Sequence, residues 1–342
     1  MAMMRKIFLI LTGIVLAATL LSCGSDKAPE FKAERQAKLV LTGPFAPVTY
    51  PLIWMVENNK LADVAESVEI KFWSNPDQLR ALVAGKQADF FAVPTNVAAM
   101  FYNKGVDMKL LNVAIWRAIW MVSRSGDKKT LADFKGEEIV MPFKGDMPHI
   151  VFNALSKKQG IDPEKDFNMR YVNTPMDAAQ QLIMRKADNA LLIDPAVSTV
   201  LYKSGSFPVS VIAPELYRSV DIQNEWGRLY GGKNEIPFAG IAALSTVNRD
   251  TALVNRFLEE YQNGVDWCLA HPEETAKLAV KYIEVLKEEG VAEAMRHVTL
   301  RSTPAPQAKA ALIPFFEVIN EGDAAKIGGK LPDNDFYWGE MN

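Results

Sequence analysis

The sequence is poor in the residues on which metal sites and nucleophilic catalysis depend. Its 342 residues include two cysteines and three histidines, and His149, His271 and His297 are too far apart to show a metal-ligand spacing. No nucleophile elbow, phosphate-binding loop or dinucleotide fingerprint occurs in the sequence. We therefore expect neither a metal nor a cofactor, and an enzyme becomes the less favoured class.

Blocks of positive charge are also missing. Lysine and arginine number 38 against 41 aspartates and glutamates, which gives a formal net charge of −3. A mildly acidic chain without basic clusters argues against nucleic-acid binding. With 49% hydrophobic and 23% charged residues, the composition is that of a globular protein, and the length is enough for two lobes with substantial cores.

A long apolar run is present at the N-terminus. Residues 7–21 carry no charge and follow Arg5 and Lys6. The run is shorter than the roughly 20 residues of a comfortable bilayer span, and its basic flank is typical of a signal peptide. It ends in Leu-Leu-Ser-Cys, which resembles the processing site of bacterial lipoproteins.

We predict a signal peptide over residues 1–22, a lipid-modified Cys23 as the first mature residue, and a flexible tether over residues 23–36. The protein would then be exported and anchored by lipid to a membrane, in the periplasm or at the outer cell surface. Lipidation would leave Cys268 alone, so no internal disulfide could form. The alternatives are an ordinary signal peptide in which Cys23 is incidental and, less favoured, a retained transmembrane anchor.

Short β-type runs alternate with helical segments from residue 37 onwards. The expected strands of the first half span residues 38–42, 68–73, 89–93, 108–115 and 119–123. The helices expected between them span residues 50–58, 76–84 and 95–103. Such alternation favours an α/β fold with a largely parallel sheet.

The alternation restarts after residue 130. The expected strands of this second half span residues 138–142, 169–172, 190–193 and 209–212. Its expected helices span residues 131–136, 148–159 and 175–185, and a further one opens at Asp194-Pro195. The third of these helices has a clear start, because Thr174 is a typical N-cap, Pro175 follows it and Asp177 lies three residues after the cap.

The C-terminal part combines one further strand with helices. A polar, glycine-containing stretch over residues 221–235 precedes a strand over residues 238–244. Beyond residue 248 the pattern predicts a chain that is nearly all helical. Two α/β halves followed by a helical tail suggest two lobes joined by two crossings of the chain, near Ser123 and near Pro237.

Four stretches of the chain are distinctive in their order and spacing. They are the first strand, loop and helix at residues 39–61, the run LVAGKQADF at 82–90, the run LADFKGEEIVMP at 131–142, and the segment 178–194. Together they resemble the periplasmic substrate-binding proteins of ABC importers, in the sulfonate, nitrate and thiamine-precursor group. The resemblance extends over about residues 38–280.

The resemblance implies a two-lobed α/β fold, the type II periplasmic-binding-protein fold, with two hinge crossings and a helical C-terminal tail. Residues 37–122 and 238–342 would form a discontinuous first lobe, and residues 123–237 the second. In that family the lobes close over a small ligand, and the liganded form docks onto a membrane permease. The chain would be a monomeric solute receptor without catalytic activity.

Ligands of open α/β sheets bind at the carboxyl ends of the strands, where loops and helix N-termini meet. This rule, together with nearness to the two crossings for Trp116 and Phe238, selects a set of candidate ligand-binding residues: Phe45, Tyr50, Trp73, Asn75, Thr95, Asn96, Trp116, Phe143, Lys144, Asp146, Asp194 and Phe238. Half of them are aromatic, and flat heterocycles bind well between aromatic rings. Asn75, Asn96 and Thr174 have helix capping as an alternative role. Trp226, in the polar stretch, is a candidate to close over the mouth of the cleft.

The candidate loops favour one ligand class over another. A sulfonate or nitrate site requires a cationic group or several small donors, whereas these loops have few serines and only Lys144 and Arg117 nearby. We therefore expect a planar heterocycle, such as a pyrimidine thiamine precursor, with a small-anion receptor as the alternative. Two other classes stay open: a ligand-sensing adaptor for a membrane kinase, and an enzyme resembling the pyrimidine-forming synthases.

Overall fold

The structure is a computed structural model that describes residues 35–207, 209–212 and 215–339. The predicted signal peptide, Cys23 and all but the last two residues of the predicted tether lie outside these residues. Within the described part of the chain, no helix combines the length and the apolar character needed to cross a membrane.

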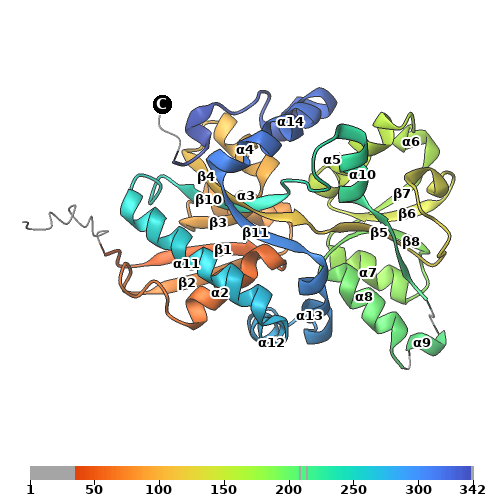
Figure 1. Ribbon diagram of the computed structural model, residues 1–342, viewed down its shortest axis with the longest axis horizontal. Coiled ribbons are helices and arrows are strands. Elements are labelled where there is room, and N and C mark those ends of the chain that lie inside the picture. Colours follow the sequence, from red (N-terminus) through yellow and green to blue (C-terminus); the bar gives the residue numbers. More distant parts are fainter. Residues whose placement is uncertain (1–34, 208, 213–214, 340–342) are drawn as a thin grey trace, which may run out of the picture. The chain divides into compact units, whose positions relative to one another are not determined.

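The first sheet begins as three parallel strands with helices between them (Figure 1). The strands are β1 (Leu39–Pro44), β2 (Val68–Trp73) and β3 (Phe90–Pro94), and β1 pairs with both others. The helices that follow them are η1 (Pro47–Thr49), α2 (Tyr50–Glu57), α3 (Pro76–Ala84) and α4 (Thr95–Asn103). Because the strands are parallel, their carboxyl ends meet at one edge of the sheet.

Strands from later in the chain complete the first sheet, whose order is β11-β4-β10-β3-β1-β2. These strands are β4 (Met108–Arg117), β10 (Ala239–Leu244) and β11 (Thr299–Pro304). Strand β10 lies between β3 and β4 and is antiparallel to both. Gly240 on β10 is required there, because a Cβ atom at this position would lie 1.9 Å from the carbonyl oxygen of Asn112.

The second sheet has the order β7-β6-β8-β5-β9. Its strands are β5 (Ile119–Ser123), β6 (Glu138–Pro142), β7 (Asn168–Val172), β8 (Asn189–Ile193) and β9 (Tyr217–Asp221). Strand β6 is parallel to β7 and β8, whereas β5 is antiparallel to β8 and β9. Both sheets are therefore mixed, which corrects the expectation of a largely parallel sheet. The reason is that β10 and β5, the strands that follow the two crossings, run antiparallel to their neighbours β3, β4 and β8.

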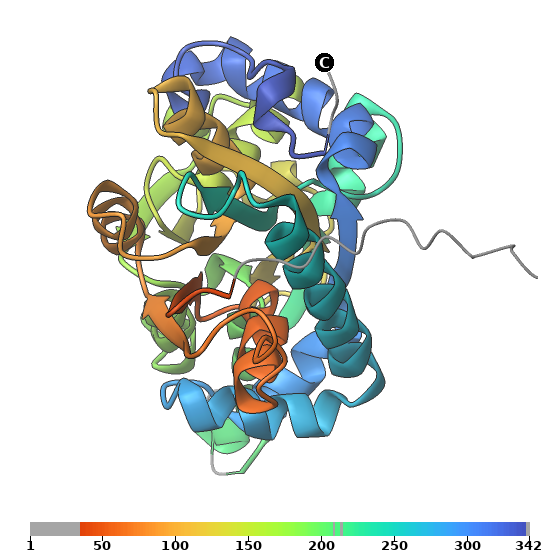
Figure 2. The ribbon, with the colours of Figure 1, turned by 90° about the vertical axis from the view of Figure 1, so that its left-hand side faces the viewer.

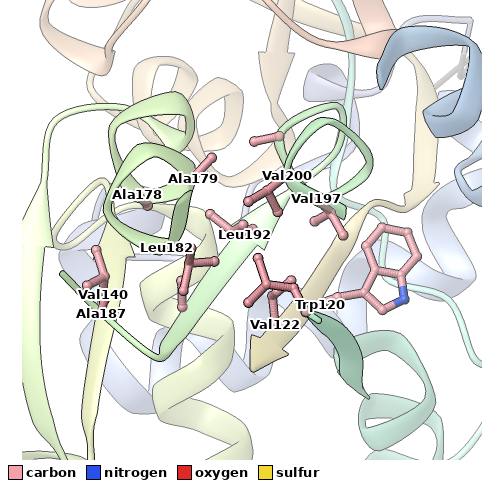
Figure 3. Close-up of a cluster of buried hydrophobic side chains, with 13 residues drawn as sticks. Trp120, Val122, Val140, Ala178, Ala179, Leu182, Ala187, Leu192, Val197 and Val200 are labelled. Atoms are coloured by element: carbon pink, nitrogen blue, oxygen red, sulfur yellow. The ribbon is translucent and has the colours of Figure 1, made fainter. Parts of the chain in front are cut away.

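The helices of the second half lie around the second sheet (Figure 1). They are η2 (Leu131–Phe134), α5 (Met147–Lys158), α6 (Pro163–Asp166), α7 (Pro175–Ile183), α8 (Ala196–Gly205), α9 (Val209–Ile212) and α10 (Ile222–Tyr230). A buried cluster that includes Leu182, Leu192 and Val200 packs α7 and α8 onto the sheet (Figure 3). The predicted start of α7 is confirmed, because Thr174 and Asp177 form a capping box.

The chain crosses between the sheets twice, and the two crossings are hydrogen-bonded to each other. The first crossing is at Ala118, between β4 and β5, and the second lies between α10 and β10. The backbone N–H of Ile236 donates to the carbonyl oxygen of Trp116 at 2.9 Å. The first crossing lies ahead of the expected position near Ser123, which is the last residue of β5. The apolar run over β4 and β5 contains no turn residue that could have marked the first crossing in the sequence.

Two sequence-based expectations are wrong, and a third is incomplete. The predicted strand over residues 209–212 is the short helix α9, and the strand that pairs with β5 is β9. The polar stretch contains α10, because Asp221 caps its N-terminus by accepting from the N–H groups of Gln223 and Asn224. Strand β11 interrupts the tail that was expected to be helical. The sequence of β11, TLRSTP, contains a single large apolar residue, Leu300, so it carries little strand signal.

The remaining helices form the C-terminal tail. They are α11 (Thr251–Ala270), α12 (Pro272–Tyr282), α13 (Glu288–His297), α14 (Ala305–Asp323), η3 (Ala324–Ile327) and η4 (Asn334–Phe336). Helix α11 packs along α2, side by side in Figure 2, where α11 is teal and α2 orange. Helix α12 contacts α2 and α13, and α13 in turn packs against α8 of the second half.

Candidate functional site

A cavity of about 220 Å³ lies between the loops of the two sheets. The first sheet contributes the loops that follow β1, β2 and β3, and the second contributes those that follow β6, β7 and β8. These loop segments of the lining are Pro44–Val48, Trp73–Ser74, Pro94, Phe143, Asp146–Pro148, Thr174–Met176 and Asp194–Ala196. The cavity therefore lies where the carboxyl ends of the strands from both sheets converge.

The lining of this cavity is apolar and contains no lysine or arginine among the described residues. Its charged members are Asp146 and Asp194. Prolines are frequent in it: Pro44, Pro47, Pro76, Pro94, Pro148, Pro175 and Pro195. The site therefore offers an apolar surface with carboxylates and lacks a cation that could pair with an anionic ligand.

Proline also occupies the first turns of helices that point at the cavity. Pro76, Pro148 and Pro175 stand at the first or second position of α3, α5 and α7. Proline fits there because its fixed φ suits the first turn. It also removes a backbone N–H group from which an anion at a helix N-terminus would otherwise accept a hydrogen bond.

Aromatic side chains from both sheets face this cavity. Phe45, Trp73, Phe143 and Phe238 belong to its lining. Phe143 has a φ of 59°, in the left-handed region, and its N–H donates to the carbonyl oxygen of Val172 at 3.2 Å. Trp73 is 5% exposed, and its indole N–H has no hydrogen-bond partner among the described residues.

Asp146 links the two sides of the cavity. Its Oδ1 lies 3.3 Å from Nη2 of Arg80, which is on α3 of the first lobe. Burial raises the pKa of Asp146, whereas the charges of Arg80 and Lys326 act to lower it. Asp146 is therefore a half-buried carboxylate that one cation from the opposite lobe already contacts.

Asp194 is fully buried and is held on its own lobe. Its Oδ2 lies 3.1 Å from Nη1 of Arg218, and its Oδ1 accepts from the N–H of Ser198 at 2.8 Å. Arg218 also donates to Oγ of Ser198 at 2.6 Å and lies over the ring of Trp120. Burial raises the pKa of Asp194, and the charge of Arg218 opposes that shift.

The structure brings half of the predicted site residues together. Those that line the cavity are Phe45, Trp73, Phe143, Asp146, Asp194 and Phe238. The others, which lie outside its lining, are Tyr50, Asn75, Thr95, Asn96, Trp116 and Lys144.

Three of the residues outside the lining support the loops and the crossings instead. Asn75 caps α3 by accepting from the N–H groups of Asp77 and Gln78. Thr95 donates from its hydroxyl to the carbonyl oxygen of Pro237 at 2.6 Å, in the second crossing. Asn96 donates to the carbonyl oxygen of Lys326 at 3.2 Å.

The other three make contacts elsewhere or are buried outside the lining. Tyr50 is fully buried, which raises its pKa well above the usual range. Trp116 donates from Nε1 to the carbonyl oxygen of Arg301 at 3.1 Å. Lys144 extends over the ring of Tyr171.

Trp226 does not close over the cavity. It is buried on α10, where its ring packs against Tyr230 and Phe315. Its helical spacing with Ile222 and Tyr230 was the signal for a packed face rather than a mobile stretch.

Sequence reasoning missed several apolar residues of the lining. Leu79, Val97, Met176 and Ile193 look like ordinary core residues of helices and strands, so nothing marks them in the sequence. Val285 belongs to the connector between α12 and α13, which no strand-end rule selects.

Comparison with solved structures identifies the class of fold. An ABC transporter structure from Parabacteroides distasonis aligns with a TM-score of 0.72 at 20% identity, covering 88% of this chain and 99% of that chain. The periplasmic aliphatic sulphonate binding protein of Escherichia coli aligns with a TM-score of 0.66 at 15% identity, covering 89% and 93%. The periplasmic nitrate-binding protein of Synechocystis aligns with a TM-score of 0.65 at 14% identity, covering 86% and 85%. The predicted two-lobed α/β fold is confirmed.

The family follows from the sequence. Residues 66–275 match the family described as NMT1/THI5 like. This match covers more than half of the chain, so the chain belongs to the NMT1/THI5-like family. None of the curated proteins matches it in sequence.

Proposed function

We propose that this protein is the solute receptor of an ABC import system and has no catalytic activity of its own. It is exported, a lipid on Cys23 holds it at a membrane, and it delivers a small ligand from the cavity to a membrane permease. Its fold is shared with the sulphonate-binding and nitrate-binding proteins, and a cavity between two lobes suits a receptor that closes on its ligand. A tether near the permease would raise the effective concentration of the receptor.

The ligand that we propose is a small planar heterocycle, uncharged or cationic, such as a pyrimidine precursor of thiamine. The observation that carries this proposal is the lining, whose described residues include four aromatic rings and two aspartates but no basic residue. Rings stack on flat ligands, and a carboxylate accepts from ring N–H or amino groups. The volume of about 220 Å³ is below the roughly 300–1,000 Å³ of sites for drug-sized ligands, so the ligand is small.

Isothermal titration calorimetry tests this ligand class. Purified protein is titrated with an amino-hydroxymethylpyrimidine, with taurine and with nitrate. We expect saturable binding of the pyrimidine, and saturable binding of the anions alone would contradict the proposal. Phe143→Leu should weaken pyrimidine binding roughly twofold to tenfold, because one stacking contact is lost. Phe207→Leu is the matched control, since Phe207 is 85% exposed and lies outside the lining.

The second candidate is a receptor for a small anion. Two proteins of similar structure bind sulphonate and nitrate, which favours this candidate. Arg80 and Lys326 are the cations near Asp146 that such a ligand could recruit, although neither belongs to the lining. The same titration separates the two candidates, because Arg80→Gln should weaken binding of an anion and leave binding of an uncharged pyrimidine nearly unchanged.

A further inference from the structure

We propose that the connector between α12 and α13, residues 283–287, is a third wall of the cavity, and that Val285 on it contacts the ligand and contributes to specificity. This inference rests on the proposed receptor function, because it adds a contact for the same ligand. Val285 is the one described lining residue that lies beyond Ala239 in the chain. The C-terminal tail therefore reaches a site that is otherwise built from the two sheets and the elements around them.

Val285 is an exposed apolar side chain on an anchored segment. It is 48% exposed, whereas its neighbours Ile283 and Leu286 are 2% and 1% exposed. The N–H of Ile283 donates to the carbonyl oxygen of Ala279 at 2.8 Å, and that of Leu286 donates to the carbonyl oxygen of Ile283 at 3.0 Å. The two buried neighbours fix the backbone, so Val285 is held at the cavity and does not sample it as part of a loose loop.

The helices on either side tie this connector to both lobes. Helix α12 packs on α2, which follows the lining residues Pro47 and Val48. Helix α13 packs closely on α8, since a Cβ atom at Gly290 would lie 2.0 Å from Oγ1 of Thr199. Helix α8 begins at Ala196, which is also a lining residue. Closing the cavity around a ligand would therefore bring Val285 into contact with it.

The chemistry of Val285 selects one part of the ligand. A branched aliphatic side chain provides no hydrogen bond, so its partner has to be an apolar edge such as a methyl group or a ring face. Covering its exposed surface removes apolar area from water on binding. A small inorganic anion has no apolar edge and would gain nothing from this wall.

Two probes and one matched control test the contact. Val285→Ala and the control Ile313→Ala are compared with wild type in binding the amino-hydroxymethylpyrimidine and the uncharged dye 6-propionyl-2-dimethylaminonaphthalene. Ile313 is a similar exposed aliphatic residue on α14, outside the lining. We expect Val285→Ala to weaken binding of at least one probe roughly threefold to tenfold, because two methyl groups leave the contact. Ile313→Ala should bind as wild type does, and the melting temperatures of both variants should match that of wild type.

The outcomes separate this inference from the proposed function. If wild type binds the dye but not the pyrimidine, the proposed ligand class fails, and the dye still reports on Val285. If Val285→Ala binds every probe that wild type binds within twofold of its affinity, the third wall is wrong. If wild type binds neither probe, both proposals are overturned.

Discussion

His149 fixes the loop that carries Phe143 and Asp146 into the cavity. Its Nδ1 accepts from the N–H of Gly145 at 3.0 Å, and its Nε2 lies 3.1 Å from the hydroxyl of Tyr171. Burial lowers the pKa of His149, and the charges of Lys326, Lys144 and Lys157 lower it further against an opposing effect of Glu164. The neutral imidazole is therefore the form that the folded loop requires.

We therefore expect His149 to make the folded protein less stable in acid. The folded protein holds the pKa of His149 below its ordinary value near 6.5. The contribution of neutral His149 to the stability of the fold is therefore present above that pH and is lost as the pH falls through the folded pKa. Urea unfolding of wild type and His149→Gln at several pH values checks this. The difference in unfolding free energy should be largest above pH 7 and shrink towards pH 5. The same pH dependence of the unfolding free energy in wild type and His149→Gln would contradict this prediction. His271→Gln is the control, because His271 is an exposed histidine.

The proposed lipid on Cys23 determines where the receptor is attached. Cys23→Ala removes the thiol that would carry the lipid, so the protein should move from the membrane fraction to the aqueous extracytoplasmic fraction of its host. Fractionation followed by immunoblotting measures this. Cys268→Ala should leave the protein with the membrane, because Cys268 is buried in α11. Unchanged membrane retention of Cys23→Ala would refute the anchor.

At the scale of elements, α4 holds the second crossing through a single residue. The hydroxyl of Thr95, the first residue of α4, donates to the carbonyl oxygen of Pro237, and the N–H of Thr95 donates to the carbonyl oxygen of Phe238 at 3.1 Å. Both oxygen atoms belong to the segment that leads into β10. A buried carbonyl oxygen that loses its hydrogen-bond donor still bears the free-energy cost of desolvation, with no hydrogen bond to offset it.

Thr95→Val should therefore destabilise the fold by about 1–3 kcal/mol, since it keeps the shape of the side chain and leaves the Pro237 carbonyl without the hydroxyl donor. Thr95→Ser keeps that donor and should cost clearly less. Urea denaturation measured by circular dichroism gives both values. If Thr95→Val is as stable as wild type, the hydrogen bond does not hold the crossing.

At the scale of the whole molecule, the two crossings, the Arg80–Asp146 pair and the packing of α13 on α8 connect the two lobes. The crossings at Ala118 and at residues 231–238 are short and hydrogen-bonded to each other, which is the arrangement of a hinge. The ion pair spans the cavity, but it is partly exposed and is worth only about 0–1 kcal/mol. Closure would therefore depend mainly on contacts that the ligand makes with both lobes.

Ligand should close the lobes about these crossings. Small-angle X-ray scattering with and without saturating amino-hydroxymethylpyrimidine should give a smaller radius of gyration for the liganded protein. Taurine, at the same concentration, is the comparison for a ligand that the lining does not favour. If the pyrimidine binds by calorimetry and the radius of gyration does not change, hinge closure is wrong.

Much of the local structure could be predicted from the sequence. The bounds of β2, α3, α4 and β6 match their predicted ranges because alternation, proline at helix starts and N-cap residues act over a few neighbours. The strand predicted over residues 209–212 is wrong because the local pattern there conflicts with the tertiary structure. Its β-branched residues favour a strand, but the position beside β5 is filled by β9.

The candidate site could be predicted only in part. Phe45, Trp73 and Phe143 follow strands directly, so the strand-end rule places them at the cavity. Trp116 follows the same reasoning, yet β11 packs beside β4 and the indole bonds to Arg301 instead. Val285 has no sequence signal, because its place depends on the packing of α13 against α8.

By itself, the sequence determined the order of helices and strands, the two α/β halves and the likeness to binding proteins of ABC importers. These properties arise from periodicity, caps and prolines, which are interactions between residues close in the chain. Only the tertiary structure decided that β10 lies between β3 and β4, that half of the candidate residues meet in one cavity, and that no lysine or arginine of the described chain lines it. The physical reason is that burial and strand pairing depend on partners far along the chain, and no local pattern records which partner wins.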